Sequence, residues 1–287
     1  MVVYNSELLI VLRTEMNLMA VEPRLASAVV LLRDSTSRQG IEVFMVRRVI
    51  QSDFMPDVYV FPGGSVSKDD RAAELAEGVC KPITSSAADP EGGTALGGGA
   101  RVAAIRELFE EAGILLAYRH EKLLAINDQN VKHFDTYRKA FQQRQGSLIV
   151  MARTEHLTLA TNLLDYFAHW ITPEGMPKRF DTHFFLTTAP AEQQAAHDHL
   201  ETSEGIWISP TEALARFERK EFPLVFATIY QLRELAAFGS VEEALKMTTK
   251  QRIPTHVPVL IQEDGKTRVF LQEDAANTWE VPEHLTR

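Results

Sequence analysis

The sequence contains a single cysteine, Cys80, among its 287 residues. One thiol excludes an intrachain disulfide, and it also excludes a zinc site that needs several cysteines. Because structural disulfides are typical of oxidising compartments, a chain without them fits a reducing environment. We therefore expect the protein to be cytoplasmic.

The chain also lacks an excess of basic residues. Lys and Arg number 30 against 39 Asp and Glu, which gives a formal net charge of −9 and a pI near 5.5. A nucleic-acid surface needs concentrated positive charge, so this balance argues against a nucleic-acid partner. An acidic protein can still act on phosphates where a bound cation supplies positive charge locally.

Long apolar runs are absent as well. The run LLIVL at 8–12 is bracketed by Glu7, Arg13 and Glu15, so it is too short for a membrane span and has no basic lead of a signal peptide. The whole composition, with 45% apolar and 24% charged residues, is that of a globular protein with a sizeable core. We expect a small molecule as the partner, and no membrane.

Apolar patterning predicts a mixture of strands and helices. The expected strands lie at 26–34, 41–49, 57–66, 170–173, 182–189 and 205–209, with a final hairpin at 258–272 around Asp264-Gly265. The expected helices lie at 71–79, 100–112, 130–144, 153–168, 210–218, 223–238 and 241–249. The absence of a repeat or linker predicts one α/β domain at 24–287 after an N-terminal extension at 1–23, with a helical addition at about 130–168.

Residues 81–100 read KPITSSAADPEGGTALGGGA. A stretch so rich in Gly, Ser, Ala and Pro cannot supply a core. We expect it to form most of a flexible insertion at about 71–100, extruded from the domain rather than joining two domains.

The segment RELFEEAG at 106–113 carries three glutamates on one helix face. Glu107, Glu110 and Glu111 are spaced so that their carboxylates are neighbours, and like charges placed in this way repel by a few tenths of a kcal/mol. A solvated surface would explain a random pair of glutamates. Here the segment follows an FPGG turn, and Arg106 can orient a carboxylate, so a divalent cation such as Mg²⁺ or Mn²⁺ becomes the better explanation.

These residues resemble the Nudix box, G-x5-E-x7-R-E-U-x-E-E-x-G-U, where U is a bulky apolar residue. Gly64 matches the first glycine, and Arg106 to Ile114 match every fixed position of the second half. Two departures stand out. Asp70 replaces the first glutamate, and residues 71–105 number 35 where the box has seven. The box is therefore split by an insertion, which puts the role of Asp70 in doubt.

A split box is typical of a Nudix subgroup that includes a mammalian peroxisomal coenzyme A diphosphatase and its bacterial relatives. The chain resembles that subgroup at 54–64, 103–117, 170–173, 179–185 and 201–214. The general coenzyme A signature fits less well. Arg48 matches it, but Val49, Asp53 and Asp57 stand where Ser, Arg and Gly belong.

The resemblance implies a Nudix α/β/α sandwich with a mixed sheet, an insertion inside the box and extra helices. It also implies metal-dependent hydrolysis of the diphosphate in a nucleoside diphosphate derivative. Coenzyme A or an acyl-coenzyme A is the first candidate substrate. The implied metal ligands are Glu107, Glu110, Glu111 and a carbonyl of Gly63 or Gly64, and the implied catalytic residues are Glu107, Glu110 and Arg106. The candidate substrate-binding residues are Arg48, Phe54, Tyr59 and Gly64, and the candidate general bases are Glu201 and Glu204.

Three alternatives remain at this point. An ADP-ribose or dinucleotide (NADH) pyrophosphatase would use the same metal box, since the box is indifferent to the attached group. A non-catalytic nucleotide-sensing Nudix module would be expected to lose box carboxylates, and a scaffold with an acidic helix would show no effect of divalent cations. Some Nudix enzymes form dimers, so a homodimer is a further expectation.

Overall fold

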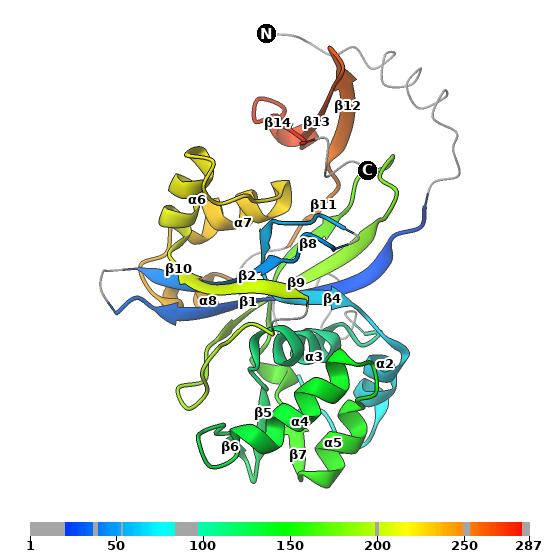
Figure 1. Ribbon diagram of the computed structural model, residues 1–287, viewed down its shortest axis with the longest axis vertical. Helices are drawn as coiled ribbons and strands as arrows, with labels where there is room; N and C mark the ends of the chain where they lie inside the picture. Colours follow the sequence, from blue (N-terminus) through cyan, green and yellow to red (C-terminus); the bar gives the residue numbers. More distant parts are fainter. Residues whose placement is uncertain are drawn as a thin grey trace.

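The centre of the protein is an eight-stranded mixed sheet (Figure 1). The computed structural model describes residues 21–36, 40–52, 54–83, 97–198, 201–248 and 253–282. The first 20 residues, with the run at 8–12, and the stretch 84–96 of the expected insertion lie outside the described residues, as does Asp53. No helix among the described residues has the length and apolar character that a membrane span requires.

Strand β1 (Arg24–Asp34) lies in the middle of the sheet. It pairs in parallel with β9 (Phe180–Thr188) along most of its length, and it pairs antiparallel with β2 (Ile41–Arg48) at one end and with β4 (Gly63–Ser65) at the other. The remaining members are β3 (Tyr59–Val60), β8 (Asp165–Ile171), β10 (Thr202–Ile208) and β11 (Thr255–His256).

Both faces of the central strands are buried, which explains their nearly continuous apolar sequence. Val29 and Leu31 pack on one face against helix α3 (Ala100–Ala112), whereas Val30 and Leu32 pack on the other, where α7 (Phe226–Leu235) lies. Helices α2 (Lys68–Leu75), α4 (Val131–Gln142) and α5 (Leu148–Thr154) surround α3 on its side of the sheet (Figure 1). Helix α6 (Pro210–Glu218) packs beside α7, and α8 (Val241–Thr248) contacts strands β1, β8 and β9.

Two smaller sheets complete the described chain. One consists of β12 (Val259–Glu263), β13 (Lys266–Phe270) and β14 (Trp279–Glu280), and the other of β5 (Ala117–Arg119), β6 (Lys122–Leu123) and β7 (Leu157–Leu159). The predicted hairpin is confirmed, because Asp264 and Gly265 turn with φ values of 53° and 74° between β12 and β13. Positive φ at both central residues is the requirement of the tightest hairpin turn.

One predicted helix is wrong. Helices α4 and α5 lie in the predicted helical addition, but residues 157–159 and 165–171 are strands β7 and β8 rather than the second half of a helix at 153–168. Strand β8 gains a long antiparallel partner in β9, and β7 gains one in β5. Pairing with these partner strands decides the local structure. The predicted α/β/α sandwich with a mixed sheet is confirmed by the layers on either side of the sheet.

Candidate active site

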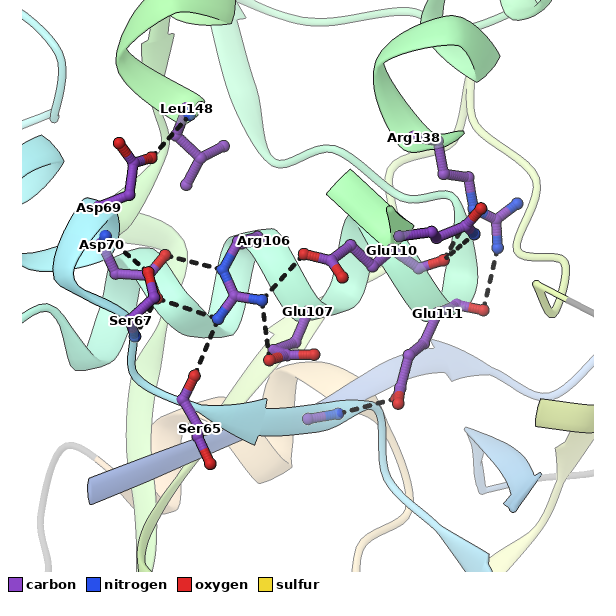
Figure 2. Close-up of polar contacts among 12 residues, drawn as sticks. Ser65, Ser67, Asp69, Asp70, Arg106, Glu107, Glu110, Glu111, Arg138 and Leu148 are labelled. Carbon is purple, nitrogen blue, oxygen red and sulfur yellow. Dashed lines mark hydrogen bonds and ion pairs between the residues drawn. The ribbon is translucent and has the colours of Figure 1, made fainter. Parts of the chain in front are cut away.

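Helix α3 directs Glu107 and Glu111 toward strand β4 (Figure 2). Both side chains are buried, with residue exposures of 8% and 6%. The backbone N–H of Gly63 donates to Glu111 Oε2 at 3.0 Å. At Gly64, an added Cβ would lie 2.3 Å from Glu107 Oε1, so a larger residue there would displace this carboxylate from its position. The FPGG turn and the acidic helix predicted from the sequence therefore form a single site.

Arg106 connects the carboxylates to one another. Its Nη1 donates to Glu107 Oε1 at 2.8 Å and to Glu110 Oε1 at 2.9 Å. Its Nε and Nη2 each lie 2.9 Å from an oxygen of Asp70, and Nη2 also donates to the Ser65 carbonyl. Figure 2 shows this fan of contacts. A bidentate guanidinium fixes direction as well as charge, so Arg106 holds these carboxylates in a fixed orientation.

Asp70 is fully buried and belongs to this site despite the insertion. It occupies the first turn of α2, where its backbone N–H donates to Ser67 Oγ at 3.1 Å and its Oδ2 accepts from the Ser67 N–H at 2.7 Å. This reciprocal cap holds the start of the helix. The doubt about Asp70 is resolved in structural terms, because its carboxylate binds Arg106 as the two halves of the box meet.

The junction between α2 and α3 brings the split box back together. The Gly99 N–H donates to Glu74 Oε2 at 3.0 Å, and Arg71 Nε donates to the Gly98 carbonyl at 3.3 Å. Gly99 has a φ of +86°, and an added Cβ would lie 2.7 Å from the Arg71 nitrogen. The backbone that closes the insertion therefore packs directly on the backbone of α2.

Burial and mutual repulsion raise the pKa values of the three glutamates. Burial raises the pKa of Glu107 to about 7 against the opposing charge of Arg106. Burial and then Glu107 raise the pKa of Glu111 well above its usual range, and burial also raises that of Glu110. Carboxylates that resist ionising together are a suitable set of ligands for a divalent cation, which would remove the repulsion.

The structure separates the two candidate general bases. Glu201 is close enough to raise the pKa values of both Glu110 and Glu111 by its charge. Glu204 instead accepts a hydrogen bond from the Tyr59 hydroxyl at 2.6 Å. The Tyr59 ring is buried and stacked on Phe222 at 3.6 Å, and burial followed by the contact with Glu204 raises its pKa to about 12. Glu201 thus acts on the box carboxylates, whereas Glu204 is bound to Tyr59.

Arg48 and Phe54 are connected through Ser52 in the segment that follows β2. The charge of Arg48 lowers the pKa of Glu111, which places it near the box. Its Nε and Nη2 donate to Ser52 Oγ at 3.1 and 2.9 Å, and Ser52 Oγ donates to the Phe54 carbonyl at 3.1 Å. The Phe54 ring packs edge-on against Phe180, with ring centres 5.0 Å apart.

Arg138, on α4, is a residue of the site that sequence reasoning missed. It donates to the backbone carbonyls of Glu110 and Glu111 at 2.9 and 3.0 Å and to that of Ala196 at 2.8 Å. It thereby caps the C-terminal end of α3, where a positive charge is favourable, and ties it to the segment leading to Glu201. Backbone carbonyls exist at every residue, so no sequence pattern marks this contact.

A second cluster, formed by His169, Asp181 and His183, lies on strands β8 and β9. His169 Nε2 lies 2.5 Å from Asp181 Oδ1, and potential ligand atoms of all three residues lie within 4.8 Å of one another. The two imidazole rings are stacked at 4.3 Å and only 17° from parallel. A metal ion cannot lie in the planes of two stacked rings at once, so the carboxylates of α3 fit a cation better than this cluster does.

Comparison with known proteins identifies the family. The family model of the NUDT19 Nudix domain matches residues 21–235, which is most of the chain. The chain belongs to this Nudix family. The predicted split-box subgroup and the predicted class of enzyme, a Nudix hydrolase acting on phosphoric anhydrides, are thus confirmed.

Two of the Nudix relatives are named acyl-coenzyme A diphosphatase NUDT19. The Xenopus laevis protein is 26% identical over 81% of this chain and 70% of its own length. The human protein is 26% identical over 72% of this chain and 64% of its own length. A crystal structure of a Nudix hydrolase from Alicyclobacillus acidocaldarius has a TM-score of 0.63 at 24% identity, covering 81% of this chain and 98% of that one, which shows the fold.

Proposed function

We propose that the protein hydrolyses the diphosphate of coenzyme A or an acyl-coenzyme A in a reaction that depends on Mg²⁺ or Mn²⁺. The observation that carries the proposal is the reassembled box, in which Asp70 and Arg106 hold Glu107 and Glu110 while Glu111 faces Gly63. The names of the similar proteins supply the substrate class. A reducing, cytoplasmic location suits such a substrate.

Glu107, Glu110 and Glu111 would hold the cation, with the Gly63 carbonyl as a further ligand. When bound, a divalent cation neutralises phosphate oxygens and lowers the pKa of water. Arg106 keeps the carboxylates in place through its contacts with Asp70 and Ser65. A water molecule then forms a new bond to phosphorus, and the bridging P–O bond breaks.

Glu201 is the group we assign to accept the proton of the attacking water. The Asp198 carboxylate accepts from the backbone N–H groups of Glu201 and Thr202 at 3.1 and 2.9 Å. A general base has to be fixed within hydrogen-bond reach of the water, and a backbone anchored at Glu201 itself supports this role. Arg48, whose charge acts on Glu111, is the group we assign to meet the negative charge of the substrate.

Product analysis tests the proposal. The purified protein would be incubated with millimolar Mg²⁺ and coenzyme A, acetyl-coenzyme A, ADP-ribose, NADH or diadenosine polyphosphates, with Glu111→Gln as the control. We expect 3′,5′-ADP and a phosphopantetheine from wild type, and at least a hundredfold slower release from the variant. Cleavage of ADP-ribose or NADH alone would overturn the proposal that coenzyme A compounds are the substrates. Binding of nucleotide without any product would favour a non-catalytic nucleotide-sensing module.

A further inference from the structure

An apolar cavity of about 170 Å³ lies beside β8 and β9, on the face of the sheet opposite α3. Its walls come from the two strands, from the start of α7 and from the small C-terminal sheet. Almost all of the lining atoms are apolar. The lining residues that matter here are Phe54, Trp170, Phe184, Ala227, Leu260 and Trp279.

The cavity is connected to the candidate active site along the chain. Arg48, whose charge acts on Glu111, is hydrogen-bonded to Ser52, and Ser52 holds the carbonyl of Phe54. The ring of Phe54 then forms part of the cavity wall. The last residue of β2, Arg48, therefore places a positive charge near the box carboxylates, and Phe54 in the loop that follows forms part of the cavity wall.

The register of the sheet gives the distance between the two places. Gly63 on β4 is paired with Ala28 on β1, and Ala28 is paired with Phe184 on β9. Adjacent strands are about 5 Å apart, so the backbone of Gly63 lies roughly 10 Å from that of Phe184. Within the described chain, β4 pairs with no strand besides β1, so the edge of the sheet that separates the α3 face from the cavity face lies at β4.

We infer that this cavity binds the acyl chain of an acyl-coenzyme A whose diphosphate lies at α3. The inference rests on the proposed function and adds the location and the size of the acyl-binding subsite. A nucleotide base would need hydrogen-bonding partners that such walls do not offer, whereas a hydrocarbon chain gains about 0.8 kcal/mol for each buried methylene. With space for several methylenes, the cavity predicts a preference for acyl chains of medium length over acetyl.

The test compares substrates that differ only in the acyl chain. Wild type would be assayed with coenzyme A, acetyl-, octanoyl- and palmitoyl-coenzyme A, and kcat/KM should be about tenfold higher for octanoyl- than for acetyl-coenzyme A. Ala227→Phe fills the cavity and should lower kcat/KM about tenfold more for octanoyl-coenzyme A than for coenzyme A. Ala237→Phe, at an exposed position just beyond the end of α7, is the matched control and should leave the ratio unchanged.

The outcomes separate the inference from the proposed function. Equal kcat/KM across the series, or an equal loss for all substrates in Ala227→Phe when its melting temperature matches wild type, would overturn the acyl-binding cavity and leave the coenzyme A activity standing. If Ala227→Phe is unstable, Leu260→Phe on the facing sheet provides the same comparison. Failure of wild type to cleave any coenzyme A compound would overturn both.

Discussion

A single guanidinium, that of Arg106, holds both halves of the split box. It contacts Asp70 from the segment before the insertion and Glu107 and Glu110 from the helix after it. The acidic residues and Arg106 could be predicted from the sequence, because the spacing of like charges on one helix face demands an explanation. Arg138 could not, since its partners are carbonyl oxygens 27 to 58 residues away in the chain.

The effect on kcat should differ sharply between Glu201→Gln and Glu204→Gln. Because Glu201 acts on the box carboxylates and Glu204 is bound to Tyr59, we expect Glu201→Gln to lower kcat by about 10² or more and Glu204→Gln to change it by only a few-fold. Steady-state kinetics under saturating Mg²⁺ measure both. The reverse order would move the role of general base to Glu204.

His183 should make stability depend on pH. Burial, then the charges of His169 and Arg101, lower its pKa from 6.5 to about 4, against the opposing charge of Asp181. Its Nδ1 lies 2.9 Å from the Tyr166 hydroxyl. The unfolded chain therefore takes up a proton at higher pH than the folded protein does, so stability present above pH 6.5 is lost as the pH falls toward 4.

Urea unfolding of wild type and His183→Asn at pH 7 and pH 4.5 measures this effect. Between these two pH values, wild type should lose on the order of 2 kcal/mol more stability than the variant. A fall of the same size in both proteins would show that His183 does not titrate in this way.

Among the elements, those with strong local signals were predicted well. The predicted helices at 100–112 and 210–218 are found as α3 and α6; α3 ends at Gly113, whose φ is 72°, and α6 begins with Pro210 after the capping residue Ser209. Residues 157–168 were predicted wrongly as helix, because their apolar residues suit a helix as well as a strand. The choice was made by pairing with β9, which follows β8 directly in the chain, and with β5, which lies about 40 residues before β7.

The α2–α3 junction should be sensitive at Gly99. An alanine there meets the Arg71 nitrogen at 2.7 Å and the Asp70 carbonyl carbon at 2.9 Å, in addition to an unfavourable φ. We expect Gly99→Ala to destabilise the protein by about 3 kcal/mol and to lower kcat at least tenfold, because the clash displaces Asp70 and hence Arg106.

Gly78→Ala provides the matched control for this substitution. Gly78 also has a positive φ, of +75°, but an added Cβ would have no neighbour within 4 Å. Gly78→Ala should lower the free energy of unfolding by about 1 kcal/mol and leave kcat unchanged. Equal effects at the two glycines, by thermal unfolding and kinetics, would mean that contact across the junction does not matter.

For the molecule as a whole, the acidic cluster should make stability depend on divalent cations. Buried carboxylates that repel one another oppose folding, and a ligand that binds only the folded state stabilises it by about 3 kcal/mol at a hundred times its Kd. Millimolar Mg²⁺ should therefore raise the melting temperature of wild type by several degrees.

Glu111→Gln removes one of the repelling charges. Without added metal, this variant should melt above wild type, and Mg²⁺ should shift it less. Glu218→Gln, on the exposed end of α6, should respond to Mg²⁺ as wild type does. Differential scanning calorimetry with and without EDTA measures all three proteins, and an identical response in Glu111→Gln would remove Glu111 from the ligands.

The parallel pairing of β1 with β9 also has a consequence for biosynthesis. Residues 24–32 pair with residues 180–188, so β1 leaves the ribosome about 150 residues before its long partner is made. Until then β1 has an open, apolar edge that can pair with another nascent chain. Folding should therefore be slow for a domain of this size, and a chain arrested before residue 180 should depend on chaperones to stay free of aggregates.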